Sequence, residues 1–372
     1  MCELGSFITN GTDAPFYVRR VLDIEKNILK ATAKVCGLGQ FEFHINGQKV
    51  GDHELDPGWT DYRKYVEYVT FDVTGYLRQG KNAVGAEIGN GWYIMNREHY
   101  SFDFPAFMPP NPNPYRPFGK QLVFAMRLEL LYVDGTAEVF TAGEGFRTAP
   151  HPVLQSNVYG SETIDAARFR PGWDTVGFDD SDWSDALVAE DAPVASLVEQ
   201  FQPPVKVIRR YAPTLLGTVN GREIYDIGQN ISGVLELCLR GRKGDAVRVY
   251  PAEKLGPDGD VDQVMKDWTT LDAVITFILG EDDVWQRFRM KFTYFAGRVL
   301  AVERSRPGIE LSDMRADAIS STWKASGSFR CDDERYQKVY DMIERTVEAN
   351  MLSVHTDCPT IERFAWQEPN HL

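Results

Sequence analysis

Two acids flank a tryptophan near the end of the chain. Glu362, Trp366 and Glu368 follow the turn Asp357-Cys358-Pro359 within a few residues. Cleavage of a glycosidic bond needs a carboxylic acid that protonates the leaving oxygen, and an aromatic face can stack on the sugar ring. The alternative is that Glu362 and Arg363 are surface charges and that Trp366 belongs to the core. Spacing alone favours this alternative, because catalytic roles depend on geometry.

An amphipathic helix is predicted directly before this turn. From Tyr336 onward, apolar residues recur with the three-four spacing of one helix face. They are Val339, Tyr340, Ile343, Val347 and Met351. Asp332 or Asp333 can cap the start of the helix, where an acid also suits the positive end of the helix dipole. We expect the apolar face to be exposed, because no partner for it is evident in the sequence.

The segment from Ser353 to Trp366 resembles the opening of the catalytic domain of bacterial α-L-rhamnosidases. That inverting family is built on an (α/α)6 barrel, and six residues here match its pattern position for position. The matching residues are Asp357, Cys358, Pro359, Glu362, Arg363 and Trp366. Ile361 stands where the family has Arg, Ala365 where it has Gly, and Pro369 where many members have Asp.

This resemblance implies roles for the residues of the turn. Glu362 falls where the family carries its proton-donating acid, and Asp357 where it carries a sugar-binding carboxylate. Trp366 would form a wall of the pocket, and we place Arg363 and Glu368 with the substrate-binding residues. The resemblance also implies that the general base and most of the barrel lie beyond Leu372. We therefore expect no hydrolysis by the 372-residue chain as given.

Composition excludes several other classes of protein. The net charge of −14 argues against a nucleic-acid or anionic-membrane partner, which would need a basic surface. No apolar run approaches the length of a membrane helix, and the start lacks a signal-peptide pattern, which favours the cytoplasm. The five cysteines are scattered without a Cys-x-x-Cys pair, so neither a disulfide framework nor a zinc site is predicted. We expect no metal and no cofactor, because phosphate-loop, metalloprotease and nucleophile-elbow motifs are all missing from the sequence.

The first part of the chain predicts an antiparallel β-sandwich. Short stretches of alternating apolar residues are separated by Gly and Asn, as in Phe41–Ile45 followed by Asn46-Gly47. Asn-Gly is the strongest short hairpin signal, because both turn residues need positive φ. The proline-rich stretch from Phe104 to Phe118 predicts a long surface loop. Strands resume with Gln121–Tyr132, and a hairpin turn at Asp134-Gly135 is predicted before Glu138–Thr141.

Aromatic and acidic turns in this part leave alternatives open. Trp59, Trp92 and Tyr93 could contact carbohydrate, but packing at the end of a sandwich is the default interpretation. The stretch from Phe178 to Trp183 offers oxygens for calcium, yet it lacks the EF-hand spacing and is better explained as a turn. Four stretches of this part resemble the N-terminal sandwich of the rhamnosidase family: Asn46–Gly51, Asp56–Asp61, Gly89–Tyr93 and Phe178–Trp183.

Strands resume after a polar, proline-bearing boundary near residue 200. The fold class is therefore predicted as mainly β, with two successive antiparallel β-sandwiches followed by the first helix of an (α/α)6 barrel. We assign residues 1–200 to the first sandwich, 201–325 to the second, and 326–372 to the start of the barrel.

The resemblance implies the N-terminal part of a glycoside hydrolase that removes terminal α-L-rhamnose from glycosides or polysaccharides with inversion. The alternative is a non-catalytic carbohydrate-binding or scaffolding protein made of the two sandwiches. The expected partner is a rhamnose-containing carbohydrate, with no nucleic acid and no membrane, and a homodimer remains open.

Overall fold

The computed structural model describes residues 4–94, 118–158, 161–190, 196–263, 273–323, 327–360 and 363. These residues form two compact units, and each is described by itself. The first unit holds the described residues of 1–95, 115–155 and 168–201, and the second holds the rest. The predicted loop from Phe104 to Phe118 lies outside the described residues, apart from Phe118 itself.

One sheet of the first unit is organised around two long, fully paired strands. Within the described residues its order is β15 (Leu187–Val188), β1 (Ile8–Thr9), β9 (Val123–Tyr132), β3 (Ile28–Leu38), β7 (Tyr65–Asp72) and β16 (Ser196–Glu199), and β10 (Ala137–Thr141) also pairs with β9. The β16–β7 pair is parallel, while β3 pairs antiparallel with both β9 and β7.

A second sheet of the same unit supplies the opposite face of the core. Its described order is β14 (Ser184–Asp185), β11 (Arg147–Pro150), β2 (Phe16–Ile24), β8 (Gly80–Gly89), β4 (Gln40–Ile45) and β5 (Gln48–Lys49). Phe16 and Phe43 of this sheet and Val35 and Phe124 of the other belong to one cluster of buried side chains. Shared burial of this kind makes the two sheets a sandwich, as predicted.

The predicted Asn46-Gly47 hairpin is confirmed. It connects β4 to β5, and both turn residues have positive φ, 51° at Asn46 and 84° at Gly47. The Asn46 side chain also fixes the turn to the neighbouring strand, since its Nδ2 donates to Asn82 Oδ1 at 2.8 Å. The second predicted turn, Asp134-Gly135, connects β9 to β10.

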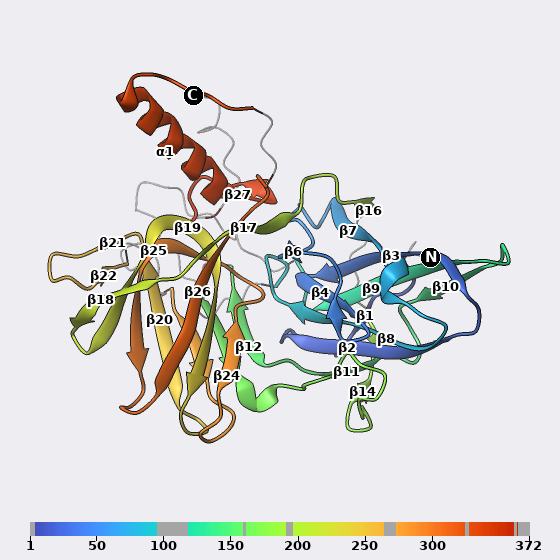
Figure 1. Ribbon diagram of the computed structural model, residues 1–372. Coiled ribbons are helices and arrows are strands. Elements are labelled where there is room, and N and C mark those ends of the chain that lie inside the picture. Colours follow the sequence, from blue (N-terminus) through green and yellow to red (C-terminus); the bar gives the residue numbers. More distant parts are fainter. Residues whose placement is uncertain are drawn as a thin grey trace. The chain divides into compact units, whose positions relative to one another are not determined.

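The second unit is built on the long strand β19 (Arg222–Arg240), which carries an irregularity between Asp226 and Ile231. Strands on both sides of β19 extend the described sheet (Figure 1). They run in the order β13 (Ser161–Asp165), β23 (Ile275–Ile278), β20 (Ala246–Ala252), β25 (Phe295–Arg304), β19, β26 (Glu310–Ser320) and β17 (Val205–Tyr211), with β18 (Thr214–Val219) and β24 (Gln286–Arg289) also paired to β19.

One segment of this sheet comes from far earlier in the chain. β13 pairs parallel with β23, so residues 161–165 belong to the second unit. The ranges 1–200, 201–325 and 326–372 remain a prediction about independent domains. The remaining short elements are β6 (His53–Glu54), η1 (Thr74–Tyr76), β12 (Val153–Asn157), η3 (Ala166–Arg168), β21 (Lys254–Leu255) and β22 (Val261–Asp262).

The predicted helix is present as α1 (Glu334–Asn350), drawn in red in Figure 1. Asp333 is its N-cap, because the Asp333 carboxylate accepts a hydrogen bond from the amide of Arg335. Met351 does not continue the helix face as predicted. It begins β27 (Met351–Leu352), which pairs with β28 (Val354–His355), and its carbonyl accepts from the amide of Ser321 at 2.8 Å.

The predicted exposure holds for most of the helix face. Val339, Ile343 and Val347 are between 39% and 55% exposed, whereas Tyr340 is half-buried, with its ring centre 4.9 Å from that of Phe329. The helix is tied to the sheet of its unit near its C-terminus, where Arg209 binds Glu348 through two hydrogen bonds of 2.7 and 2.6 Å. The Ser232 hydroxyl also donates to the carbonyl of Ala349 at 2.6 Å.

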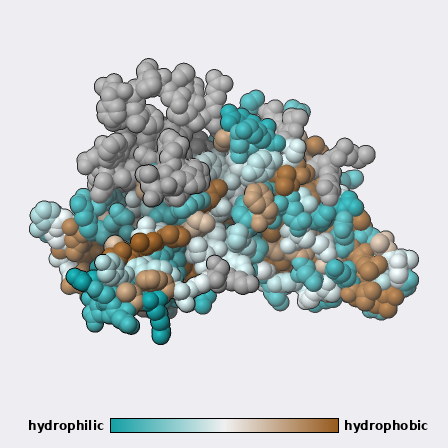
Figure 2. All heavy atoms as spheres, turned by 90° about the horizontal axis from the view of Figure 1, so that it is seen from above, coloured by the Kyte–Doolittle hydropathy of each residue, from teal (hydrophilic) through white to brown (hydrophobic). Residues whose placement is uncertain are grey.

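The predicted fold class is confirmed, since the described chain is mainly β with one α-helix. No helix within the described ranges is long and apolar enough to cross a membrane. On the face shown in Figure 2, hydrophobic residues form separate groups among hydrophilic ones.

Candidate active site

The chain reaches Asp357 through a tightly bonded hairpin. The amide of Thr356 donates to the carbonyl of Asn350 at 2.8 Å, and its hydroxyl lies 3.0 Å from Asn350 Oδ1. Both residues are buried, and Ser353 at the turn between them has a positive φ of 69°. The hairpin therefore fixes where the chain leaves helix α1 and where Asp357 begins.

Asp357 is half-buried, and one of its carboxylate oxygens stands out. Its Oδ1 is shielded from solvent and has no hydrogen-bond partner among the described residues. Buried polar atoms in proteins almost always have a partner. A carboxylate oxygen in this state can accept a hydrogen bond from a ligand hydroxyl, which is the role predicted for Asp357.

Arg363 lies deep in the second unit. Its side chain is only 2% exposed, and Nη1 donates to the carbonyls of Val158 at 2.7 Å and Tyr294 at 2.8 Å. The guanidinium carbon is 3.9 Å from the centre of the Tyr294 ring. These contacts anchor the Arg363 side chain within the second unit, and its contact with substrate remains a prediction.

The same environment changes the pKa of the Tyr294 hydroxyl. Burial raises the pKa of its hydroxyl to about 12, although the nearby charge of Arg363 acts in the opposite direction. The phenol therefore stays neutral at physiological pH, and its ring can receive the cation on its face. A small cavity of about 30 Å³ borders Arg363 and Thr360, with Glu253, Asp262 and Gln263 among its other lining residues.

Glu362, Trp366 and Glu368 lie outside the described residues. Of the predicted site residues, the structure therefore describes Asp357 and Arg363. Both belong to the second unit, and both influence the ionisation of Tyr294 through their charges.

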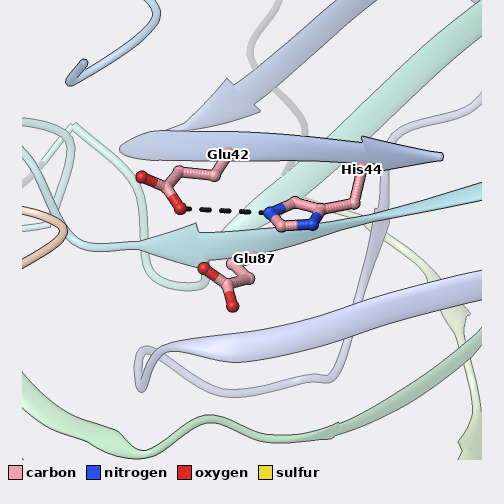
Figure 3. A group of neighbouring side chains, drawn as sticks. All are labelled: Glu42, His44 and Glu87. Atoms are coloured by element: carbon pink, nitrogen blue, oxygen red, sulfur yellow. Dashed lines mark ion pairs between the residues drawn. The ribbon is translucent and has the colours of Figure 1, made fainter. Parts of the chain in front are cut away.

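A polar cluster in the first unit was not predicted from the sequence. Glu42 and His44 on β4 and Glu87 on β8 each offer one ligand atom, and these atoms lie within 4.8 Å of one another (Figure 3). Glu42 and Glu87 are direct cross-strand partners. The alternation Glu42-x-His44 places both side chains on one face of a strand, but the pairing with Glu87 needs the register.

Basic groups surround the carboxylates of this cluster. Lys49 Nζ lies 2.9 Å from Glu42 Oε1, and His151 Nε2 lies 3.7 Å from Glu87 Oε1. His44 Nδ1 is 2.9 Å from Asp174 Oδ2, which connects the strand to the loop that precedes β14. A bound cation would compete with Lys49 for Glu42, so the arrangement favours an ion-pair network that fastens this loop to the sheet.

The aromatic residues of the first unit follow the packing interpretation. Trp59 and Trp92 stack with ring centres 4.5 Å apart and pack against the core, and Tyr93 is only 1% exposed. The stretch from Phe178 to Trp183 forms a turn, and Trp183 is buried beside Tyr17 and Trp173.

Comparison with known families covers most of the chain. Residues 26–209 match the alpha-L-rhamnosidase N-terminal domain, and residues 217–320 match the bacterial alpha-L-rhamnosidase concanavalin-like domain. Residues 324–372, which carry α1 and the Asp357 turn, match the bacterial alpha-L-rhamnosidase 6 hairpin glycosidase domain. The chain belongs to the bacterial α-L-rhamnosidase family.

Similar family members are much longer than this chain. An alpha-L-rhamnosidase of Formosa agariphila is 30% identical over 370 residues, which is 96% of this chain and 37% of the relative. One from Streptomyces avermitilis is 30% identical over 344 residues, covering 92% of this chain and 32% of its own length. The chain thus spans about a third of the length of these curated relatives and corresponds to their N-terminal portion.

Solved rhamnosidase structures share the fold. The alpha-L-rhamnosidase from Dictyoglumus thermophilum superimposes with a TM-score of 0.82 at 29% identity, covering 95% of this chain and 38% of that one. The Streptomyces avermitilis enzyme complexed with L-rhamnose gives a TM-score of 0.81 at 28% identity, covering 97% and 33%. The enzyme from Aspergillus terreus gives 0.86 at 26% identity, covering 98% and 42%.

Proposed function

We propose that the protein represented by this rhamnosidase-family chain hydrolyses terminal α-L-rhamnose from glycosides or polysaccharides with inversion. One observation carries this proposal: a half-buried Asp357 follows helix α1 within the segment that matches the glycosidase domain. Its Oδ1 has no hydrogen-bond partner among the described residues, so it can accept a hydrogen bond from a sugar hydroxyl.

In this mechanism Glu362 is the general acid. It protonates the glycosidic oxygen as the bond to the sugar breaks, while a second carboxylate outside these 372 residues takes a proton from the attacking water. In inverting glycosidases the two carboxyl groups stand roughly 6.5–9.5 Å apart, which leaves room for that water. Separate acid and base groups on opposite sides of the sugar explain inversion in a single displacement.

The other predicted residues bind the sugar or shape its pocket. Asp357 accepts hydrogen bonds from rhamnose hydroxyls, and Trp366 offers an apolar face to the ring. Glu368 adds a second acceptor for hydroxyls. Arg363 contributes through its anchoring contacts with Val158 and Tyr294.

The test uses the full gene product and an aryl α-L-rhamnoside. We expect release of rhamnose, first as the β-anomer in a proton NMR time course, because a single displacement inverts the anomeric centre. Asp357→Asn is expected to raise KM, whereas Asp332→Asn, an exposed control before the helix, leaves it unchanged. A full gene product that binds rhamnosides without cleaving them would instead support the carbohydrate-binding alternative.

Location and assembly are separate proposals. Cys238 and Cys331 are free thiols, which is typical of a reducing compartment, and we propose a cytoplasmic location. Cell fractionation tests this location. The homodimer stays a prediction, and light scattering of the full gene product tests it.

A further inference from the structure

The contacts of Arg363 indicate more than a general structural role. A guanidinium that is only 2% exposed has lost nearly all contact with water, and this is costly unless its donors are satisfied. Here Nη1 donates to two main-chain carbonyls, and the face of the Tyr294 ring receives the charge at 3.9 Å. The side chain is therefore held at several points at once.

The backbone of Arg363 points to the same conclusion. Its φ of +55° is in the left-handed region, which residues other than glycine rarely adopt. Such a conformation persists where surrounding contacts fix it, and it is concentrated at functional sites. At Arg363 the contacts of its side chain with Val158 and Tyr294 are among those that fix it.

The surface that receives Arg363 is itself rigidly held. Tyr294 lies in the connection between β24 and β25, and the Glu162 carboxylate accepts hydrogen bonds from the amides of Lys291 at 2.9 Å and Phe292 at 2.8 Å in that connection. Glu162 is 1% exposed and lies on β13, the strand that joins the second unit from earlier in the chain. Hydrogen bonds within the second unit thus hold in place the connection whose Tyr294 contacts Arg363.

Arg363 directly follows Glu362 in the chain. Consecutive Cα atoms are about 3.8 Å apart, so fixing the backbone of Arg363 restricts where the Glu362 carboxyl can lie. Resting on the function proposed above, we propose that Arg363 is a positioning residue. Its buried guanidinium fastens the active-site segment to Tyr294 and Val158, and thereby sets the place of the proton donor.

The experiment compares variants of the full gene product on two rhamnosides. Nitrophenolate leaves easily without a proton, whereas the alkoxide of methyl α-L-rhamnoside needs the general acid. Arg363→Met keeps the bulk of the side chain but removes its donors. We expect kcat on the methyl rhamnoside to fall about 100-fold, the order of loss that a 1 Å displacement of a catalytic group causes. KM and the kcat for the nitrophenyl rhamnoside should change much less.

Two further variants keep the test informative if Arg363→Met folds poorly. Arg363→Lys retains the charge but loses the planar fork, so we expect an intermediate loss of kcat. Tyr294→Phe retains the ring and the carbonyl that accept the guanidinium, and it serves as the matched control with near-normal kcat. Amide hydrogen exchange across residues 357–363 gives a readout independent of activity, and it should speed up in Arg363→Met and Arg363→Lys only.

Different failures have different signatures. A rise in KM with unchanged kcat in Arg363→Met would show that Arg363 contacts substrate, and it would overturn the positioning role. Unchanged exchange across residues 357–363 in both Arg363 variants would overturn it as well. If the wild-type gene product cleaves no rhamnoside, the proposed function fails, while the exchange experiment still decides whether Arg363 anchors the segment.

Discussion

Two buried arginines, one in each unit, are held by different chemistry. Arg19 on β2 is 1% exposed and forms an ion pair with Asp180, and its Nη2 donates to the carbonyl of Thr175 at 2.9 Å. Arg363 is 2% exposed and donates to the carbonyls of Val158 and Tyr294. Burial lowers the pKa of the Arg19 guanidinium, and the charge of Asp174 partly offsets that effect.

The different partners of the two arginines indicate different roles: Arg19 stabilises the fold of its unit, whereas Arg363 holds a local segment in place. Arg19 connects a central strand of the first unit to the loop that carries Trp173 and Trp183, so its contacts join two parts of a folded core. Arg363 belongs to the segment after helix α1, and its contacts fasten that segment to a sheet that has its own core. We therefore expect loss of Arg19 to weaken the fold of the first unit, and loss of Arg363 to release a local segment.

The largest expected effect follows from Arg19→Met. The substitution removes the hydrogen bonds from the buried Arg19 guanidinium to the Asp180 carboxylate and to the carbonyl of Thr175. Hydrogen bonds from a charged group contribute about 1.5–3 kcal/mol each, so we expect the free energy of unfolding to fall by about 3 kcal/mol. Urea denaturation followed by tryptophan fluorescence measures this loss. The control is Arg298→Met, which breaks a more exposed pair with Asp226 and should cost less than about 1 kcal/mol. Equal losses in both variants would contradict the importance of burial.

Arg363→Met tests whether the second buried arginine contributes less to global stability than Arg19. The same substitution at a similarly buried arginine should lower the free energy of global unfolding by only about 1 kcal/mol, close to the net contribution of a hydrogen bond. Exchange of the β2 amides should be unaffected, while exchange at Asp357, Cys358, Thr360 and Arg363 should become faster. A loss of stability as large as that in Arg19→Met would mean that the segment is part of the core.

Asp333→Ala asks whether the helix or Arg363 holds the segment. Loss of an N-cap costs about 1 kcal/mol, and α1 has an exposed apolar face that gives it little compensation. We expect faster amide exchange in the first turn of α1 and unchanged exchange across residues 357–363. Asp332→Ala is the control, because Asp333 and not Asp332 caps the helix. Loss of protection in both regions would assign the anchoring to the helix.

The smallest expected effect is a pH dependence of stability that comes from the partly exposed ion pair between Asp226 and Arg298. The hydrogen bonds from Arg298 lower the pKa of Asp226 below its ordinary value. A carboxylate with a lowered pKa in the folded state stabilises the fold above its unfolded pKa of about 4, and that stability is lost as the pH falls through the folded pKa. Asp226→Asn should therefore reduce the acid sensitivity of unfolding between about pH 5 and 2 by less than 1 kcal/mol. An unchanged acid limb in urea titrations would contradict the pairing.

The features that the sequence predicted correctly depend on neighbouring residues. Asn46-Gly47 specifies its turn because both residues tolerate positive φ, and Asp333 specifies a helix start through its own side chain. The apolar pattern of α1 also predicted an exposed face. The end of the helix was placed one residue late, because Met351 bonds to Ser321 of a distant strand.

The features that the sequence missed depend on pairing between distant residues. Nothing near Glu42 indicates that Glu87 lies directly opposite on the next strand. Likewise, Ser161–Asp165 gives no local sign that it pairs with Ile275–Ile278 in the second unit. Arg363 has the sequence context of a surface charge or a substrate ligand, and its burial against Tyr294 appears only in the fold. The roles predicted for the site residues remain predictions; these residues are Asp357, Glu362, Arg363, Trp366 and Glu368.

We propose that this rhamnosidase-family chain supplies the proton donor Glu362. The most direct measurement compares wild type and Glu362→Gln of the full gene product on methyl and 4-nitrophenyl α-L-rhamnosides. Loss of a general acid costs about 10²–10⁴-fold. We predict a loss of that order in kcat for the methyl rhamnoside and a loss of less than about 10-fold for the nitrophenyl rhamnoside, whose leaving group needs little protonation. Equal losses on both substrates would contradict the claim and assign Glu362 another role.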